Sequence, residues 1–214
     1  MKKIILVFIT FTVFLISLAF NYSKSINTGL ASNMIRLHVV ANSNSKNDQL
    51  LKLQIRDKVL EYANSILSGS SNIDETNYIL NKNLDNISNV VKNYMREKSV
   101  NYDVRLLLGE FFFPTKTYGD VILPAGKYQA LRILIGEAKG ENWWCVLFPP
   151  LCFVDATHGK LSDDVKRKLK QQLTKEEYDI ITNDSDDIPI KFKFKVVELF
   201  QTSRLKLAGI FNKN

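Results

Sequence analysis

The chain has 214 residues, of which 45% are hydrophobic and 24% are charged, and its formal net charge is +7 at pH 7. These values are ordinary for a globular protein, and the length is enough for one domain or a compact pair. The positive charge is dispersed without an arginine-rich patch, which argues against nucleic-acid binding. It is compatible with adhesion to an anionic membrane face or wall polymer.

The first 20 residues have the layout of an export signal. Lys2 and Lys3 precede an apolar run over residues 4–16, and Ser17-Leu18-Ala19 follows with small residues at its ends. A basic start, an apolar centre and a small-x-small exit are typical of a secretory signal peptide. The apolar run can be extended to Phe20, near the lower length limit of a membrane span, so an uncleaved anchor is the alternative. Both readings place the rest of the chain outside the cytoplasm.

A flexible spacer is expected after this segment, because residues 21–33 are polar and show no periodicity. Residues 34–209 are predicted to form a single α+β domain. Its first element is expected to be a strand over 34–41, where apolar and β-branched residues are frequent.

Two amphipathic helices are predicted next. Ser45 or Asn47 can cap the first, apolar residues recur in it at helical spacing, and Gly69 ends it. The second covers 72–98 and has an apolar stripe of its own. A short Ser/Gly-rich turn joins the two, so we expect a long helical hairpin that buries one face of each helix.

The hydrophobic period then changes to that of strands. Strict alternation over 100–108 predicts a half-buried strand, and residues 117–123, 127–135 and 142–148 are further candidates. Short turn-forming links between successive strands favour an antiparallel β-meander, with the helical hairpin covering one of its faces.

The C-terminal region shows a looser pattern. We expect a basic helix over 163–173, a short helix ending at Ile181, a strand over 190–196 and a last short helix over 197–207. This helix and strand extension completes the predicted α+β fold.

The segment 142–154 holds both tryptophans and both cysteines of the chain. Pro149 and Pro150 exclude a helix there, so this apolar stretch must be buried in the fold or pressed against a partner. Cys145 and Cys152 can form a disulfide or remain as two buried thiols. A zinc site with His158 and His38 is a further reading, although the spacing lacks the close ligand pairs of structural zinc sites.

Catalytic motifs are absent from the sequence. There is no G-x-S-x-G nucleophile elbow and no P-loop, and the two cysteines lie among apolar residues that favour the inert thiol. The acids of the apolar region, Glu110, Glu137, Glu141 and Asp155, fall at predicted strand ends, where solvated carboxylates are expected. We therefore expect no enzyme, no cofactor, no metal and no small-molecule substrate.

Several blocks taken together resemble the stage II sporulation protein R family of endospore-forming bacteria. The blocks lie between about residues 34 and 155 and read Arg36-Leu-His-Val-Val-Ala-Asn-Ser43, Asp48-Gln-x-Leu-Lys-x-x-x-Arg56-Asp57, Phe113-Pro-Thr-Lys-x-Tyr118-Gly119, Leu123-Pro-Ala-Gly-x-Tyr128-x-Ala-Leu-Arg132, Ile135-Gly-Glu-Ala-x-Gly140, Asn142-Trp-Trp-Cys145 and Val146-Leu-Phe-Pro-Pro-Leu-Cys-Phe153. The region after Asp155 matches less clearly.

The resemblance implies a signalling protein that is made in the forespore and exported into the space between the two sporulation membranes. Its implied partner is a membrane-embedded aspartic protease, which it activates at the extracytoplasmic face. An association of the chain with the membrane, either transient or anchored, is compatible with this role. That protease then cleaves the precursor of sporulation sigma factor E. The competing readings are a secreted zinc-dependent or cell-wall hydrolase and a wall-binding module.

Aromatic and arginine side chains are the usual anchors of protein interfaces. The candidates for contact with the partner are Trp143, Trp144, Phe148, Tyr118 and Arg132. The two tryptophans are adjacent on a predicted strand and point to opposite faces. One of them is therefore expected in the core and the other at the surface.

Overall fold

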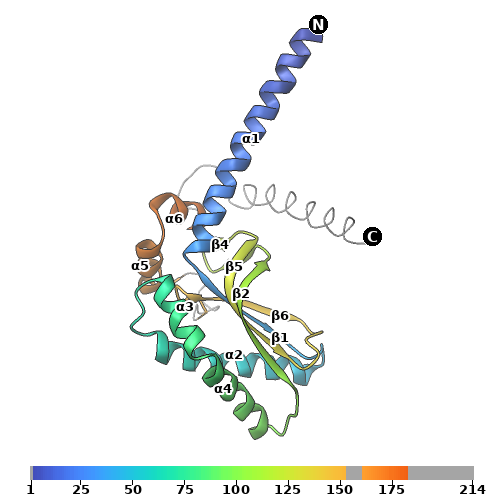
Figure 1. Cartoon of the computed structure of the whole chain (residues 1–214), viewed down its shortest axis with the longest axis vertical. Helices are drawn as coiled ribbons and strands as arrows, with labels where there is room; N and C mark the ends of the chain where they lie inside the picture. Colours follow the sequence, from blue (N-terminus) through green and yellow to red (C-terminus); the bar gives the residue numbers. More distant parts are fainter. Residues whose placement is uncertain (1, 153–160, 183–214) are drawn as a thin grey trace.

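The computed structural model describes residues 2–152 and 161–182 (Figure 1). The strand expected over 190–196 and the helix expected over 197–207 lie outside these residues. The described elements are α1 (Lys2–Ser32), β1 (Ile35–Val40), α2 (Lys46–Leu67), α3 (Ile73–Lys82), α4 (Leu84–Glu97), β2 (Val104–Phe113), β3 (Lys116–Tyr118), β4 (Val121–Leu123), β5 (Gly126–Ile135), β6 (Asn142–Phe148), α5 (Asp163–Gln172) and α6 (Lys175–Thr182).

The main sheet has the strand order β2-β5-β1-β6, and β3 pairs with β4 in a separate two-stranded sheet. The α+β class is confirmed, but the strands do not form a meander. β1 lies between β5 and β6, parallel to the first and antiparallel to the second. All six residues of β1 are buried, as expected of a central strand. The long excursion through α2, α3, α4 and β2 gives the chain room for the parallel crossover.

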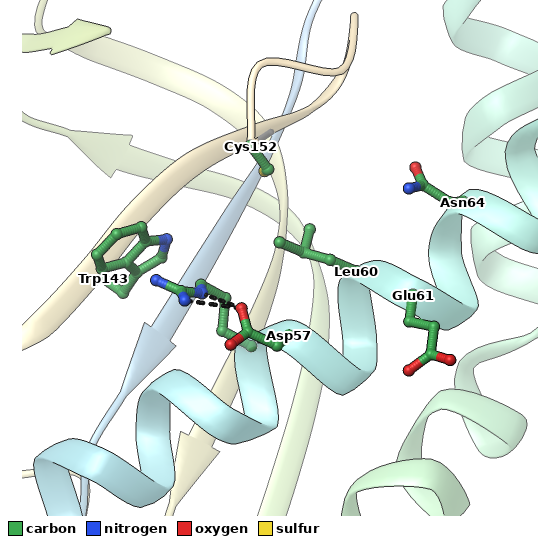
Figure 2. A pocket seen from close by; sticks show the side chains of 7 residues that line it. Asp57, Leu60, Glu61, Asn64, Trp143 and Cys152 are labelled. Atoms are coloured by element: carbon green, nitrogen blue, oxygen red, sulfur yellow. Dashed lines mark hydrogen bonds and ion pairs between the residues drawn. The ribbon is translucent and has the colours of Figure 1, made fainter. Parts of the chain in front are cut away.

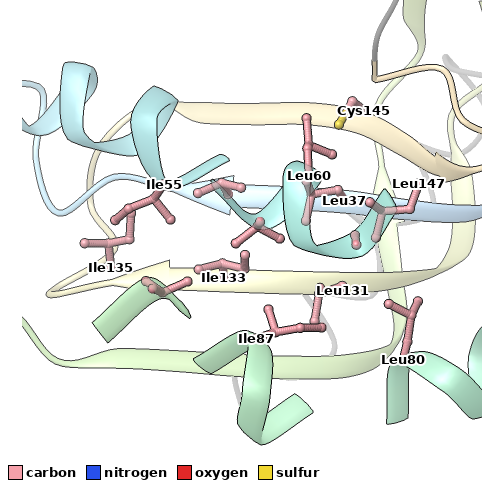
Figure 3. Close-up of a cluster of buried hydrophobic side chains, with 14 of the residues drawn as sticks. Leu37, Ile55, Leu60, Leu80, Ile87, Leu131, Ile133, Ile135, Cys145 and Leu147 are labelled. Carbon is pink, nitrogen blue, oxygen red and sulfur yellow. The ribbon is translucent and has the colours of Figure 1, made fainter. Parts of the chain in front are cut away.

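One face of the sheet is covered by α2, α3 and α4 (Figure 3). Ile35, Leu37 and Val39 project from β1 into this apolar core, in agreement with the two-residue period of a strand. The helices contribute stripes that include Ile55 of α2 and Ile87 of α4. At the start of α2, the Ser45 side chain accepts a hydrogen bond from the Asp48 amide, which supplies the predicted cap.

The helical hairpin is present, but its second arm is divided at Asn83 into α3 and α4. The Asn83 amide and side-chain nitrogen both donate to the Ile79 carbonyl, at 3.1 and 2.9 Å. The Asn83 side-chain oxygen also accepts a 3.2 Å hydrogen bond from Tyr62 of α2. Asparagine side chains compete in this way with regular helix hydrogen bonding, which explains the break.

The opposite face is covered by the end of α1, the β3–β4 hairpin, α5 and α6. Residues 21–32 are helical here, which corrects the expectation of an irregular spacer. Ile26 and Leu30 lie one helical turn apart on α1 and are both buried in this second core. A Cβ at Gly29 would overlap the carboxylate of Glu177, so glycine lets α1 approach α6 closely. The short apolar stripe is therefore sufficient to fix this part of α1.

Within the residues that the structure describes, no helix offers a stretch that is both long and apolar enough to cross a membrane.

Candidate partner-binding site

The loop after β1 is fastened to the start of α2 by a buried carboxylate. Asp48 accepts hydrogen bonds from Ser43 Oγ at 2.5 Å, Asn42 Nδ2 at 2.9 Å and Tyr102 Oη at 3.2 Å. Burial would raise the pKa of Asp48, but these hydrogen bonds outweigh it and hold the pKa below its usual value. The carboxylate is ionised and fully engaged, so its role is to fix the loop.

The same loop is joined to the turn between β5 and β6. Asn42 Oδ1 accepts a 3.0 Å hydrogen bond from the Glu137 amide, and Gly136 adopts the left-handed φ of 56° that glycine favours. A Cβ at Gly140 would overlap the Ser43 carbonyl. The loop after β1 and the turn between β5 and β6, which lie about 100 residues apart in the sequence, therefore form one structural unit.

The second face of the sheet encloses a charged arginine. Arg36 is 0% exposed, and its Cζ lies 4.4 Å from the ring centroid of Phe113, 4.9 Å from that of Tyr128 and 5.7 Å from that of Tyr118. Its Nη2 donates to Tyr118 Oη at 2.5 Å, whereas Nε and Nη1 have no acceptor among the described residues. Burial raises the pKa of Tyr128 strongly, so the surrounding hydroxyls are neutral. The cation is thus held by ring faces and one hydroxyl.

His38 lies beside Arg36 on β1 and is 4% exposed. Its Nδ1 is 3.0 Å from Arg132 Nε, and because arginine is always a donor, Nδ1 accepts and Nε2 carries the proton. Nε2 then donates to Asn142 Oδ1 at 2.6 Å, while the ring stacks on Trp144 with centroids 3.7 Å apart. Burial, with the charges of Arg132 and Arg36, lowers the pKa of His38 to about 4. The imidazole is neutral at physiological pH.

Three of the five residues expected to contact the partner, namely Trp144, Arg132 and Tyr118, instead hold Arg36 or His38 in place. Trp144 and Arg132 hold His38, and Tyr118 Oη also lies 3.2 Å from the Trp144 carbonyl oxygen. The Arg132 guanidinium lies 4.7 Å from the Phe111 ring centroid. All three side chains are half-buried and have partners inside the domain. Phe148 is only 8% exposed and packs in the first core, which corrects its assignment as a surface contact.

Trp143 projects to the opposite face of the sheet from Trp144, as the alternation along a strand predicts. It borders a hollow of about 460 Å³ between α2 on one side and Trp143 of β6 with Cys152 on the other (Figure 2). We call this hollow the Trp143 groove, and it is lined by Arg56, Asp57, Leu60, Glu61, Asn64, Trp143 and Cys152. Arg56 Cζ lies 4.1 Å from the Trp143 ring centroid, and the indole nitrogen has no acceptor among the described residues.

Cys145 and Cys152 are joined in a disulfide with their Cα atoms 5.2 Å apart. The bond removes both thiolates as nucleophiles or zinc ligands. Both ring nitrogens of His38 are engaged, and His158 lies outside the described residues. Among residues 2–152 and 161–182, no three His, Cys, Asp or Glu side chains are grouped so that they could hold a metal.

Comparison with known proteins gives the same family as the sequence blocks. The model of the stage II sporulation protein R family matches residues 31–158. Stage II sporulation protein R of Bacillus subtilis (strain 168) is 36% identical over 150 residues, which cover 70% of this chain and 66% of the relative, slightly under two thirds of its length. No solved structure matches. Family membership supports a function in sporulation. The chain belongs to the stage II sporulation protein R family.

Proposed function

We propose that this protein is an exported sporulation signal. It activates a membrane-embedded aspartic protease from the extracytoplasmic side, which leads to cleavage of the precursor of sporulation sigma factor E. The observation that carries the proposal is the family match over residues 31–158, because this region contains every strand of the main sheet and the helices α2, α3 and α4. The region that identifies the family therefore holds the whole main sheet and its first core, while α1, α5 and α6 complete the second core.

Export is supported by the first half of α1 and by the disulfide. The side chains from Ile4 to Leu18 are almost all apolar, and the large ones are exposed, as suits a segment that is used before the domain folds. Ile26 and Leu30, which hold α1 on the domain, lie beyond that segment. The bond between Cys145 and Cys152 is of a kind that persists in oxidising compartments outside the cytoplasm.

A binding role, rather than catalysis by this chain, is supported by the state of its reactive groups. The two sulfur atoms are bonded to each other, and His38 is neutral with both nitrogens engaged. Asp48 is hydrogen-bonded to Asn42 and Ser43 of the loop after β1 and to Tyr102 before β2. These are arrangements that position backbone and side chains, and none of them aims a nucleophile or a base at a cleft.

Activation by contact requires unequal affinity for two states of the protease. A ligand shifts a two-state equilibrium only to the extent that it binds one state more tightly than the other. In this proposal the domain binds the active arrangement of the protease's extracytoplasmic portion. Both faces of the domain's sheet are packed.

The test is a reconstituted processing reaction. Membranes that contain the protease and its sigma-factor precursor are incubated with protein collected from the secreted fraction of cells expressing the full chain. We expect precursor cleavage to rise with the concentration of added protein and to be absent with a heat-unfolded sample. Unchanged cleavage on addition of folded protein would reject the proposal. Release of wall fragments by the same preparation, without any protease, would favour a hydrolase.

A further inference from the structure

We infer that the Trp143 groove is the docking site for a short peptide segment of the partner in which an apolar side chain stands next to a basic one. The identity of the partner rests on the proposed function, but the chemistry of the groove can be tested without it. At about 460 Å³ the groove falls within the ~300–1,000 Å³ range of ordinary ligand pockets.

The floor of the groove is apolar. Leu60 of α2, Trp143 of β6 and the disulfide sulfur of Cys152 face the same hollow (Figure 2). Of the five partner contacts that the sequence suggested, Trp143 is the one that lines this groove. A partly buried tryptophan beside an aliphatic side chain is the environment in which a single apolar side chain of a partner contributes most to binding.

A hydrogen-bond donor in the groove also lacks a partner. The indole nitrogen of Trp143 is buried and has no acceptor among the described residues. The Arg56 guanidinium covers the ring and is held in place by Asp57, with Nη2 to Oδ1 at 2.7 Å. A small shift of the Arg56 side chain opens the indole N–H to a carbonyl oxygen of a bound peptide. An unsatisfied buried donor is costly, so the peptide recovers that cost on binding.

The rim supplies the preference for a basic residue. Asp57 and Glu61 lie one turn apart on α2, and their side chains are 62% and 73% exposed. Within the described residues, the groove is thus lined by two acidic side chains and a single basic one, Arg56. Glu61 is paired with Lys58 at 3.0 Å, but a pair so exposed is weak and readily exchanged for a partner's lysine or arginine.

Recognition is through side chains and not through strand addition. The outer side of β6 is already occupied, because the Trp144 carbonyl lies 3.2 Å from the Tyr118 hydroxyl and the Val146 carbonyl accepts the Leu151 amide at 3.1 Å. A partner strand would have to displace both of these groups. The groove is therefore expected to receive one or two side chains of a segment that crosses the rim.

The test uses Trp143 as its own reporter. In a Trp144→Phe background of the full chain, purified in detergent, Trp143 is the sole tryptophan. Two end-blocked hexapeptides are titrated, one with Leu-Lys and one with Leu-Glu at its centre. We expect the emission of Trp143 to change with both, and the Leu-Lys peptide to bind about tenfold more tightly, since like charges at the rim oppose the other.

Glu61→Lys should abolish that tenfold preference, whereas Glu110→Lys, the same change at an exposed position of β2, should retain it. Melting curves establish that each variant is folded. The inference would be overturned by equal affinity of the groove for the two peptides or by no emission change with either. It would also be overturned if both variants lost the preference for the Leu-Lys peptide to the same extent.

In the processing reaction, Glu61→Lys should reduce the stimulation of precursor cleavage and Glu110→Lys should not. Full stimulation by Glu61→Lys would reject the groove while leaving the proposed function intact.

Discussion

The two faces of the sheet are held in different ways. Beneath α2, α3 and α4 the contacts are between apolar side chains at ordinary core positions. The other face encloses a guanidinium and an imidazole among aromatic rings, with specific hydrogen bonds to Tyr118, Arg132 and Asn142. The first face derives its stability from buried area, which tolerates conservative change. On the second face, the buried Arg36 and His38 depend on a few specific hydrogen-bond and ring partners. A substitution there can have a large or a negligible effect on stability, according to which of these partners it removes.

The largest effect is expected on the apolar face. Leu37 is fully buried in the middle of β1, and Leu37→Ala leaves a cavity beneath the helices. We expect the free energy of unfolding to fall by about 3–4 kcal/mol. Urea denaturation measures the change, with Leu107→Ala at an exposed position of β2 as the control at under about 1 kcal/mol. A similar loss in both variants would contradict the assignment of the core.

The disulfide is expected to contribute the next largest effect. It closes a loop with a sequence separation of 7 residues, and the double variant Cys145→Ala/Cys152→Ala opens it. On the chain-entropy account the loss is about 2–3 kcal/mol. The melting temperature of the oxidised protein should fall on adding a reductant, and that of the double variant should not respond. Equal melting temperatures with and without reductant would contradict this prediction.

A pH dependence is expected from the second face. The pKa of His38 is lowered to about 4 in the folded protein, so the unfolded chain binds the proton more readily below the ordinary value of about 6.5. Stability is therefore complete above pH 6.5 and falls as the pH drops towards 4, by about 2 kcal/mol between pH 7 and pH 5.

The control for this prediction is His38→Phe, which keeps a ring stacked on Trp144 but cannot be protonated. Urea denaturation at pH 7 and pH 5 should give a much smaller difference for this variant. An unchanged difference would assign the pH dependence to other groups.

The last and most discriminating prediction concerns Arg36. Tyr118→Phe removes the hydroxyl that accepts from Arg36 Nη2 and should cost about 1–3 kcal/mol, because a buried cation loses an acceptor. Arg36→Met removes the charge itself and should change stability by less than about 1 kcal/mol. In the double variant the Tyr118→Phe cost should largely disappear. Additive losses in a double-mutant cycle would contradict this coupling.

The apolar face could largely be predicted from the sequence. The helical stripes around Ile55 and Ile87 are local patterns and appear where they were expected. The alternation predicted over 100–108 belongs to a strand that begins later, at Val104, and extends to Phe113. The opposed directions of Trp143 and Trp144 follow from the same two-residue period. The order of the strands could not be predicted, because the insertion of β1 between β5 and β6 depends on long-range pairing that leaves no local signal.

The polar face was harder to predict for a physical reason. Its stability depends on side chains that meet only after folding, such as Arg36 with Phe113 and His38 with Arg132. The helical state of residues 21–32 was missed because only Ile26 and Leu30 mark its buried side. The sequence predicts a turn-forming link between β5 and β6, but the close approach of Gly136 and Gly140 to the loop after β1 depends on the fold and leaves no local signal.

The most direct test of the account is the side of the membrane from which the protein acts. Sealed vesicles that contain the protease and its precursor are prepared in both orientations, and the secreted protein is added only to the outside. We predict precursor cleavage when the extracytoplasmic face of the protease points outward and none in inverted vesicles. Equal cleavage in both orientations, or cleavage only in inverted vesicles, would contradict activation by contact from outside the cytoplasm.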